Sequence, residues 1–192
     1  RDVFSKELTS AISNYGKLLD KYGDYVVKVR RIEEEAATER KDLVMRFGNE
    51  QQKSKGLKLH TEILEEEDPV ARQKLVDDLE NLTNEVSKAN PVALKINASI
   101  GNSKNEKLAQ ASFEEFQKSR EWIIATGDLA TLSRSALGML IKEIEKYKKT
   151  AKNLTPKQIK AINNTLKQLK REVRKNNPFA ILKNTIEDSK ER

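Results

Sequence analysis

The amino-acid sequence predicts an all-α protein, an elongated helical bundle with long coiled-coil segments. Of its 192 residues, 36% are hydrophobic and 35% are charged, a balance that favours long helices with narrow apolar stripes over a thick globular core. Apolar residues recur at alternating steps of three and four, which is the spacing of one helix face. All four prolines directly follow Asp, Asn or Thr, residue types that cap helix starts. No segment needs to be a strand.

The first segment predicts one long helix over residues 3–47. Its apolar residues cover about five heptads and are interrupted only at Glu39. They are Leu8, Ala11, Tyr15, Leu18, Tyr22, Tyr25, Val29, Ile32, Ala36 and Leu43. Ile12, Leu19 and Val26 widen this line on one side, so we expect the helix to pack against more than one neighbour.

A polar run bounded by two glycines predicts the end of this helix. The chain has no apolar residue between Gly48 and Gly56, so we expect a break over residues 48–56. The next helix begins with Asp68 as its cap and Pro69 in its first position, and it ends at Asn90.

The centre of the chain predicts two further helices. Pro91 starts a short helix that Gly101 closes. A longer helix follows over about 104–126 and carries much of the aromatic content. It includes Trp122, for which a core position and a partner-binding position are both open. Gly127 then supplies a stop, and Asp128 supplies the cap of the next helix, over about 129–153.

The last long helix has the clearest start signal. Thr155 is a capping residue, Pro156 suits the first helical position, and Gln158 completes a capping box. Apolar residues then take the a and d heptad positions, and we call them the apolar seam: Ile159, Ile162, Leu166, Leu169 and Val173. Basic residues take the f and b positions on the opposite side, and we call them the basic stripe: Lys157, Lys160, Lys167, Arg171 and Arg174.

The apolar seam spans fewer than three heptads, which is too short to hold a dimer alone. We therefore expect it to pack inside the bundle or to extend an interface made elsewhere, with the first helix as its natural partner. Asn177 and Pro178 start a final helix that carries Phe179, Leu182 and Ile186.

The domain organisation predicted from these elements is a single elongated helical domain over 1–192. It consists of a long coiled-coil helix (1–48), central helices (57–127), and a basic helical hairpin with a C-terminal helix (128–192). The chain opens without Met and inside a helical pattern, so we expect a fragment of a longer protein.

Positive charge is concentrated in one region. Residues 142–175 carry twelve Lys or Arg and three Glu, a net of +9, whereas the whole chain carries +7. A line of fixed charge creates a potential that attracts acidic lipid headgroups, phosphates or an acidic protein surface. The alternative is a solvated face that serves only solubility. Nucleic acid is disfavoured because the stripe lacks interleaved aromatics and glycine, and because arginine is scarce beside lysine, so stacking on bases and bidentate reading of bases have little support.

Catalytic and metal-binding patterns are missing from the sequence. There is no cysteine, and His60 is the single histidine, so thiolate metal sites and paired Glu-x-x-His sites are excluded. The runs of consecutive Glu lack calcium-loop spacing, and no Gly-rich phosphate loop is present. We predict no catalytic residues, no metal ligands and no cofactor.

One segment and the general character of the chain resemble actin-binding proteins. Residues 135–150, SALGMLIKEIEKYKKT, resemble the actin-monomer-binding WASP-homology repeat, in which an amphipathic helix precedes an extended Leu-Lys-Lys-Thr or Leu-Lys-Lys-Val segment. The resemblance is carried by Tyr147, Lys148, Lys149 and Thr150. Tyr147 stands where the repeat has leucine, and the heptad spacing continues beyond Thr150, so we expect this segment to be helical.

In its size and its cysteine-free, Lys- and Asn-rich helices, the chain also resembles the helical dimerisation domain that lies C-terminal to such repeats in bacterial effector actin nucleators. That resemblance implies pairing through coiled coils and contact with actin subunits.

These observations predict a non-enzymatic dimerisation and scaffolding domain. We expect a homodimer that holds protein partners in fixed geometry, with actin subunits in filament nucleation as the leading named candidate. The alternative is a helical module that binds acidic membrane lipids through residues 142–175. No apolar run approaches the roughly 18 residues of a spanning helix. We expect a cytosolic protein, located in the host cytosol if it is a bacterial virulence effector.

Overall fold

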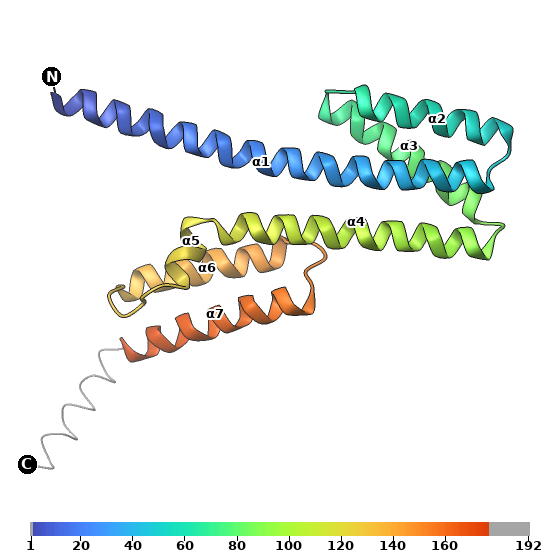
Figure 1. The fold of residues 1–192 in the computed structure, drawn as a ribbon. Helices are drawn as coiled ribbons and strands as arrows, with labels where there is room; N and C mark the ends of the chain where they lie inside the picture. Colours follow the sequence, from blue (N-terminus) through green and yellow to red (C-terminus); the bar gives the residue numbers. More distant parts are fainter. Residues whose placement is uncertain (1, 177–192) are drawn as a thin grey trace, which may run out of the picture. The chain divides into compact units, whose positions relative to one another are not determined.

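The structure, a computed structural model, describes the backbone of residues 2–176 and the side chains of residues 23–176 (Figure 1). Every regular element among these residues is an α-helix, which confirms the all-α prediction. The helices are α1 (Asp2–Phe47), α2 (Glu50–Glu65), α3 (Pro69–Ser87), α4 (Pro91–Gln117), α5 (Arg120–Ala125), α6 (Arg134–Thr150) and α7 (Pro156–Lys175). None of the described helices has the length and apolar character needed to cross a bilayer. The final helix predicted after Asn177 lies outside the described residues.

The chain forms two compact units, Arg1–Ala111 (unit 1) and Ser112–Arg192 (unit 2). The division falls inside α4, so one continuous helix contributes to both units. The sequence prediction places its subdivisions elsewhere, at the helix breaks near 48–57 and 127–128, because no proline or glycine marks the middle of α4 at this point.

Unit 1 is built from α1, α2 and α3, which pack against one another, and from residues 91–111 of α4. Its core contains Ala36, Ala37, Leu43, Val44, Leu59, Ile63, Val76, Leu79, Leu82, Val86, Ala93 and Ile100. Ion pairs join different helices around this core: Arg40–Glu80 at 3.1 Å, Arg72–Glu33 at 2.8 Å and Lys107–Glu35 at 2.8 Å. Charged side chains of unit 1 thus take part in its packing.

The turn between α1 and α2 is shorter than the predicted break over 48–56. Asn49 caps α2 in a capping box with Gln52, so only Gly48 and Asn49 separate the two helices. Gly56 is buried inside α2. A Cβ atom there would lie 2.9 Å from Cγ1 of Val44, so the glycine allows α2 to approach α1 closely instead of ending a helix.

Unit 2 has its own core, formed by the end of α4 with α5, α6 and α7. The buried residues are Phe113, Trp122, Ala125, Leu137, Leu140, Ile144, Ile162, Leu166 and Leu169. Trp122 packs edge-on against Phe113, with ring centroids 5.7 Å apart, and Phe116 stacks on Tyr147 at 3.7 Å. Trp122 is only 8% exposed. Of the two positions that the sequence left open for it, core or partner-binding, it therefore takes the core position.

The predicted helices over 91–101 and 104–126 are divided differently. α4 continues through Gly101 to Gln117, since one glycine costs a helix only about 1 kcal/mol relative to alanine and neighbouring Ile100 is packed in the core. Lys118 follows the helix in a turn. Ser119 Oγ accepts a hydrogen bond from the backbone N of Trp122 and so caps the short helix α5.

α6 begins later and ends earlier than the predicted range of 129–153. Asp128, the predicted cap, accepts a hydrogen bond from the backbone of Ala130 in a turn. Ser133 is the residue that caps α6, through its contact with the backbone N of Ala136 at 3.2 Å. The helix ends at Thr150.

Candidate anion-binding groove

The connection between α6 and α7 places these two helices side by side (Figure 1). Thr155 and Gln158 form the predicted capping box, with contacts of 3.3 Å and 2.9 Å between side chain and backbone. Asn153, in the connection, has φ 58, a left-handed conformation that Asn tolerates better than most residues. The chain therefore reverses within a few residues, and α7 returns along α6.

The apolar seam of α7 packs on α6 within unit 2. Ile162 and Leu169 are fully buried, and Leu166 is 7% exposed. They share the core of unit 2 with Leu137, Leu140 and Ile144 of α6. The first helix, which the heptad pattern favours as the partner of this seam, is not the helix that it packs on. α6 is the partner, because a short connection brings the preceding helix alongside first.

The two ends of the predicted seam differ from its middle. Val173 is half-buried, whereas Ile159 is 36% exposed and stands at the edge of the core. Two polar residues are buried on the same side of α7, Gln158 and Thr165. Thr165 Oγ1 donates to the backbone O of Ala161 at 3.2 Å, so its hydroxyl is satisfied inside the helix.

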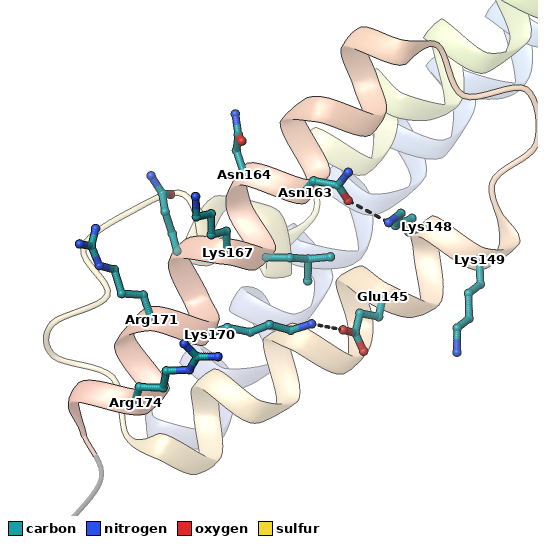
Figure 2. Close-up of a pocket in the computed structure, with 11 residues that line it drawn as sticks. Glu145, Lys148, Lys149, Asn163, Asn164, Lys167, Lys170, Arg171 and Arg174 are labelled. Carbon is teal, nitrogen blue, oxygen red and sulfur yellow. Dashed lines mark hydrogen bonds and ion pairs between the residues drawn. The ribbon is translucent and has the colours of Figure 1, made fainter. Parts of the chain in front are cut away.

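On the solvent side of this helix pair lies a basic groove of about 1250 Å³. The residues that line it come from α6 and α7 and are Glu145, Lys148, Lys149, Asn163, Asn164, Leu166, Lys167, Gln168, Lys170, Arg171 and Arg174 (Figure 2). Six of these side chains are cationic and one is anionic, a formal net charge of +5. Positive side chains on two adjacent helices reinforce one another's potential across the groove.

Two contacts cross the groove and join α6 to α7 (Figure 2). Lys170 Nζ donates to Glu145 Oε1 at 2.7 Å, and Lys148 Nζ donates to Asn163 Oδ1 at 2.8 Å. The hydrogen bond from Lys170 lowers the pKa of Glu145 below its ordinary value, and the charges of Lys149 and Lys148 lower this pKa further. Glu145 is therefore a carboxylate at neutral pH.

The other four cations of the groove make no hydrogen bond or ion pair with any described residue. They are Lys149, Lys167, Arg171 and Arg174, and all four are exposed. Figure 2 shows Lys149 on α6 and the other three along α7. Their donors are available to an anionic partner.

The basic stripe predicted from the sequence overlaps this groove in part. All five residues of the stripe are exposed, and Lys167, Arg171 and Arg174 line the groove. Lys157 and Lys160 do not line it. Lys148 and Lys149 belong to the groove but not to the predicted stripe, because only the pairing of α6 with α7 brings them beside it. Lys170 of α7 also lines the groove, although it takes neither an f nor a b position.

The segment that resembles the WASP-homology repeat lies in α6. It is helical through Thr150, as the heptad spacing predicts. Tyr147, which stands in place of the leucine of that repeat, stacks on Phe116 against the core of unit 2. Lys148 and Lys149 of the same segment line the groove.

His60, the single histidine, has a packing role. Its Nε2 lies 3.0 Å from Thr38 Oγ1, a contact between α2 and α1. Partial burial lowers the pKa of His60, and nearby Lys41 lowers it further. Among the residues that the structure describes, no group of three or more His, Asp or Glu side chains is arranged to hold a metal ion.

No protein-family model, curated protein or solved structure matches the chain.

Proposed function

We propose that the chain is a non-enzymatic helical interaction domain that binds an acidic protein partner through the basic groove of unit 2. The observation that carries this proposal is the set of four exposed cations without internal partners, on two helices that a packed apolar seam holds together. Such a site suits recognition because the packed helices that carry its charges are already in place when the partner arrives. Their combined field also speeds the encounter with an acidic surface.

The partner class follows from the form of the groove. Its lining combines cations with the amides of Asn163, Asn164 and Gln168, groups that hydrogen-bond to carboxylates and to backbone carbonyls of a polypeptide. Actin subunits remain the leading named candidate, on the resemblance stated for residues 135–150 and for the chain as a whole.

The test compares two sets of charge-neutralising substitutions. Changing Lys167, Arg171 and Arg174 to Gln removes three groove cations, and changing the exposed Lys55, Lys74 and Lys95 of unit 1 to Gln removes the same charge elsewhere. We expect the groove variant to lose about tenfold or more in affinity for an oligo-glutamate peptide, since each exposed pair contributes up to about 1 kcal/mol. Co-sedimentation with actin filaments then tests the named candidate. Equal affinities for the two variants would contradict the proposal.

Self-association through the N-terminal part of α1 is the second element of the proposal. The sequence carries the five-heptad line there, and Val26, which widens it, is 61% exposed in the single chain. Val27 is exposed to 66% but lies off that line, so it provides a matched control. We expect Val26→Asp to reduce the mass measured by light scattering from dimer to monomer, while Val27→Asp leaves the mass unchanged. A monomeric wild-type protein would contradict dimerisation.

An acidic membrane is the alternative partner, favoured by one observation. Lys157 and Lys160 are exposed but lie outside the groove, so the basic surface of α7 is broader than the groove. Flotation with phosphatidylserine vesicles separates the two classes. If Lys157→Gln with Lys160→Gln abolishes flotation, and the peptide does not bind, the membrane is the partner.

A further inference from the structure

Glu145 is the single carboxylate among the residues that line the basic groove. It projects from α6 and receives the Lys170 ammonium of α7 at 2.7 Å, with both side chains still about half exposed. One turn further along α6, Lys148 donates to the amide oxygen of Asn163 in the same way. Two cations of the groove are therefore already bound, one by a carboxylate and one by an amide carbonyl.

We propose that Glu145 acts as an internal counter-ion that occupies the position of a partner's carboxylate, so that the groove selects acidic peptide segments whose Asp or Glu displaces it from Lys170. This inference rests on the proposed function of the groove and specifies its ligand. An acidic peptide offers two kinds of hydrogen-bond acceptor, charged carboxylates and neutral amide carbonyls, and groove lysines already bind one group of each kind within the chain itself.

Two further cations lie on α7 on either side of Lys170. Lys167 precedes Lys170 by three positions and Arg174 follows it by four, so the three lie on one face of the helix. Lys167 and Arg174 have no internal partner among the described residues. A peptide carboxylate that takes the place of Glu145 at Lys170 therefore has a free cation on either side for its neighbouring acidic residues (Figure 2).

Most substitutions in a binding site weaken binding, but competition between Glu145 and the ligand predicts that removal of Glu145 strengthens it. Glu145→Gln removes the internal competitor, releases Lys170 and raises the formal charge of the groove by one. Binding of an acidic peptide should become stronger. We expect a gain of roughly two- to fivefold, the range that corresponds to one exposed ion pair.

The experiment measures fluorescence anisotropy of a fluorescein-labelled oligo-glutamate peptide with the complete chain. The matched control is Glu143→Gln, which changes the net charge equally, lies on the same helix and is exposed, but does not line the groove. We expect Glu145→Gln to bind the peptide more tightly than Glu143→Gln, which should differ little from wild type. Equal affinities for these two variants would overturn the proposal that Glu145 is an internal counter-ion.

Two further measurements separate the possible failures. If the variant with Lys167, Arg171 and Arg174 changed to Gln binds the peptide as well as wild type, the groove itself is not the binding site and the proposed function fails. If that variant loses binding while Glu145→Gln equals Glu143→Gln, only the role of Glu145 is overturned. If Glu145→Gln strengthens binding to phosphatidylserine vesicles but not to the peptide, the peptide specificity is wrong. Far-UV circular dichroism checks that each variant remains folded.

Discussion

The two units of the molecule use charge in opposite ways. Unit 1, residues 1–111, carries nineteen Lys or Arg and twenty Asp or Glu, a net of −1. Unit 2, residues 112–192, carries eighteen and ten, a net of +8. Both units nevertheless bury a comparable apolar core of helices. The excess charge of unit 2 is therefore not needed to build a helical core.

The placement of the charges explains this contrast. In unit 1 the cations of Arg40, Arg72 and Lys107 each pair with a carboxylate on another helix, so opposite charges support the packing. In unit 2 the ion pair Lys170–Glu145 joins α6 to α7, and four groove cations have no such partner among the described residues. Unit 1 thus uses several of its charges to join its own helices, whereas four cations of unit 2 have no partner within the described chain, as the proposed binding of an acidic segment requires.

The largest expected effect concerns the seam that supports the groove. Leu169 is fully buried, so Leu169→Asp places a charge in the core of unit 2 and should cost more than about 3 kcal/mol of unfolding free energy. Ile159→Asp, at the exposed end of the same seam, should cost less than about 1 kcal/mol. Urea unfolding followed by the fluorescence of Trp122, which lies in this core, measures both. Equal losses would mean that the seam is buried along its whole length.

A matched pair of Glu→Gln substitutions addresses the difference between the units directly. Arg40 is only 3% exposed, and Glu80→Gln leaves its buried charge without a counter-ion. Because Glu80 itself is partly exposed, we expect a loss of about 1–2 kcal/mol. Glu145→Gln in unit 2 breaks an exposed pair and should leave stability nearly unchanged. Thermal unfolding followed by circular dichroism measures both losses. A larger loss for Glu145→Gln than for Glu80→Gln would contradict the difference between the two units.

The smallest effect is a pH dependence confined to unit 1, which contains His60. Burial lowers the pKa of His60 in the folded state, so the unfolded chain binds a proton more readily and stability falls as pH drops below about 6.5. The full contribution is present above that pH. We expect His60→Gln to weaken this loss when unfolding is compared at about pH 7 and about pH 5.5. An unchanged pH dependence in the variant would show that other groups cause it.

The fold was predictable wherever short-range chemistry determines it. The starts of α3 and α7 follow from Asp68 and Thr155, each followed by proline, and both caps are present. The glycines were less informative. Gly56 is required by the close approach of α1, and Gly101 is tolerated within α4. The contact between α1 and α2 decides the first position, and the local sequence does not reveal it. At Gly101 an added Cβ would meet no atom within 4 Å, so the helix simply bears the cost of one glycine.

The candidate site was predictable only as far as one helix determines it. The exposure of Lys167, Arg171 and Arg174 follows from their position opposite the seam. That Lys148 and Lys149 line the groove could not be predicted, because it depends on α6, and not α1, being the partner of α7. Ser119 and Ser133 cap α5 and α6, and serine is a residue type that marks helix starts in a sequence.

The most direct test of the central claim is a titration of the ¹⁵N-labelled protein with the oligo-glutamate peptide, followed by NMR. If unit 2 binds acidic segments through its groove, amide shift changes should concentrate at the residues of α6 and α7 that line it, including Lys149, Lys167 and Arg171. They should also diminish as ionic strength is raised. Changes of equal size at the exposed lysines of unit 1 would contradict the claim, because charge alone and not the groove would then determine binding.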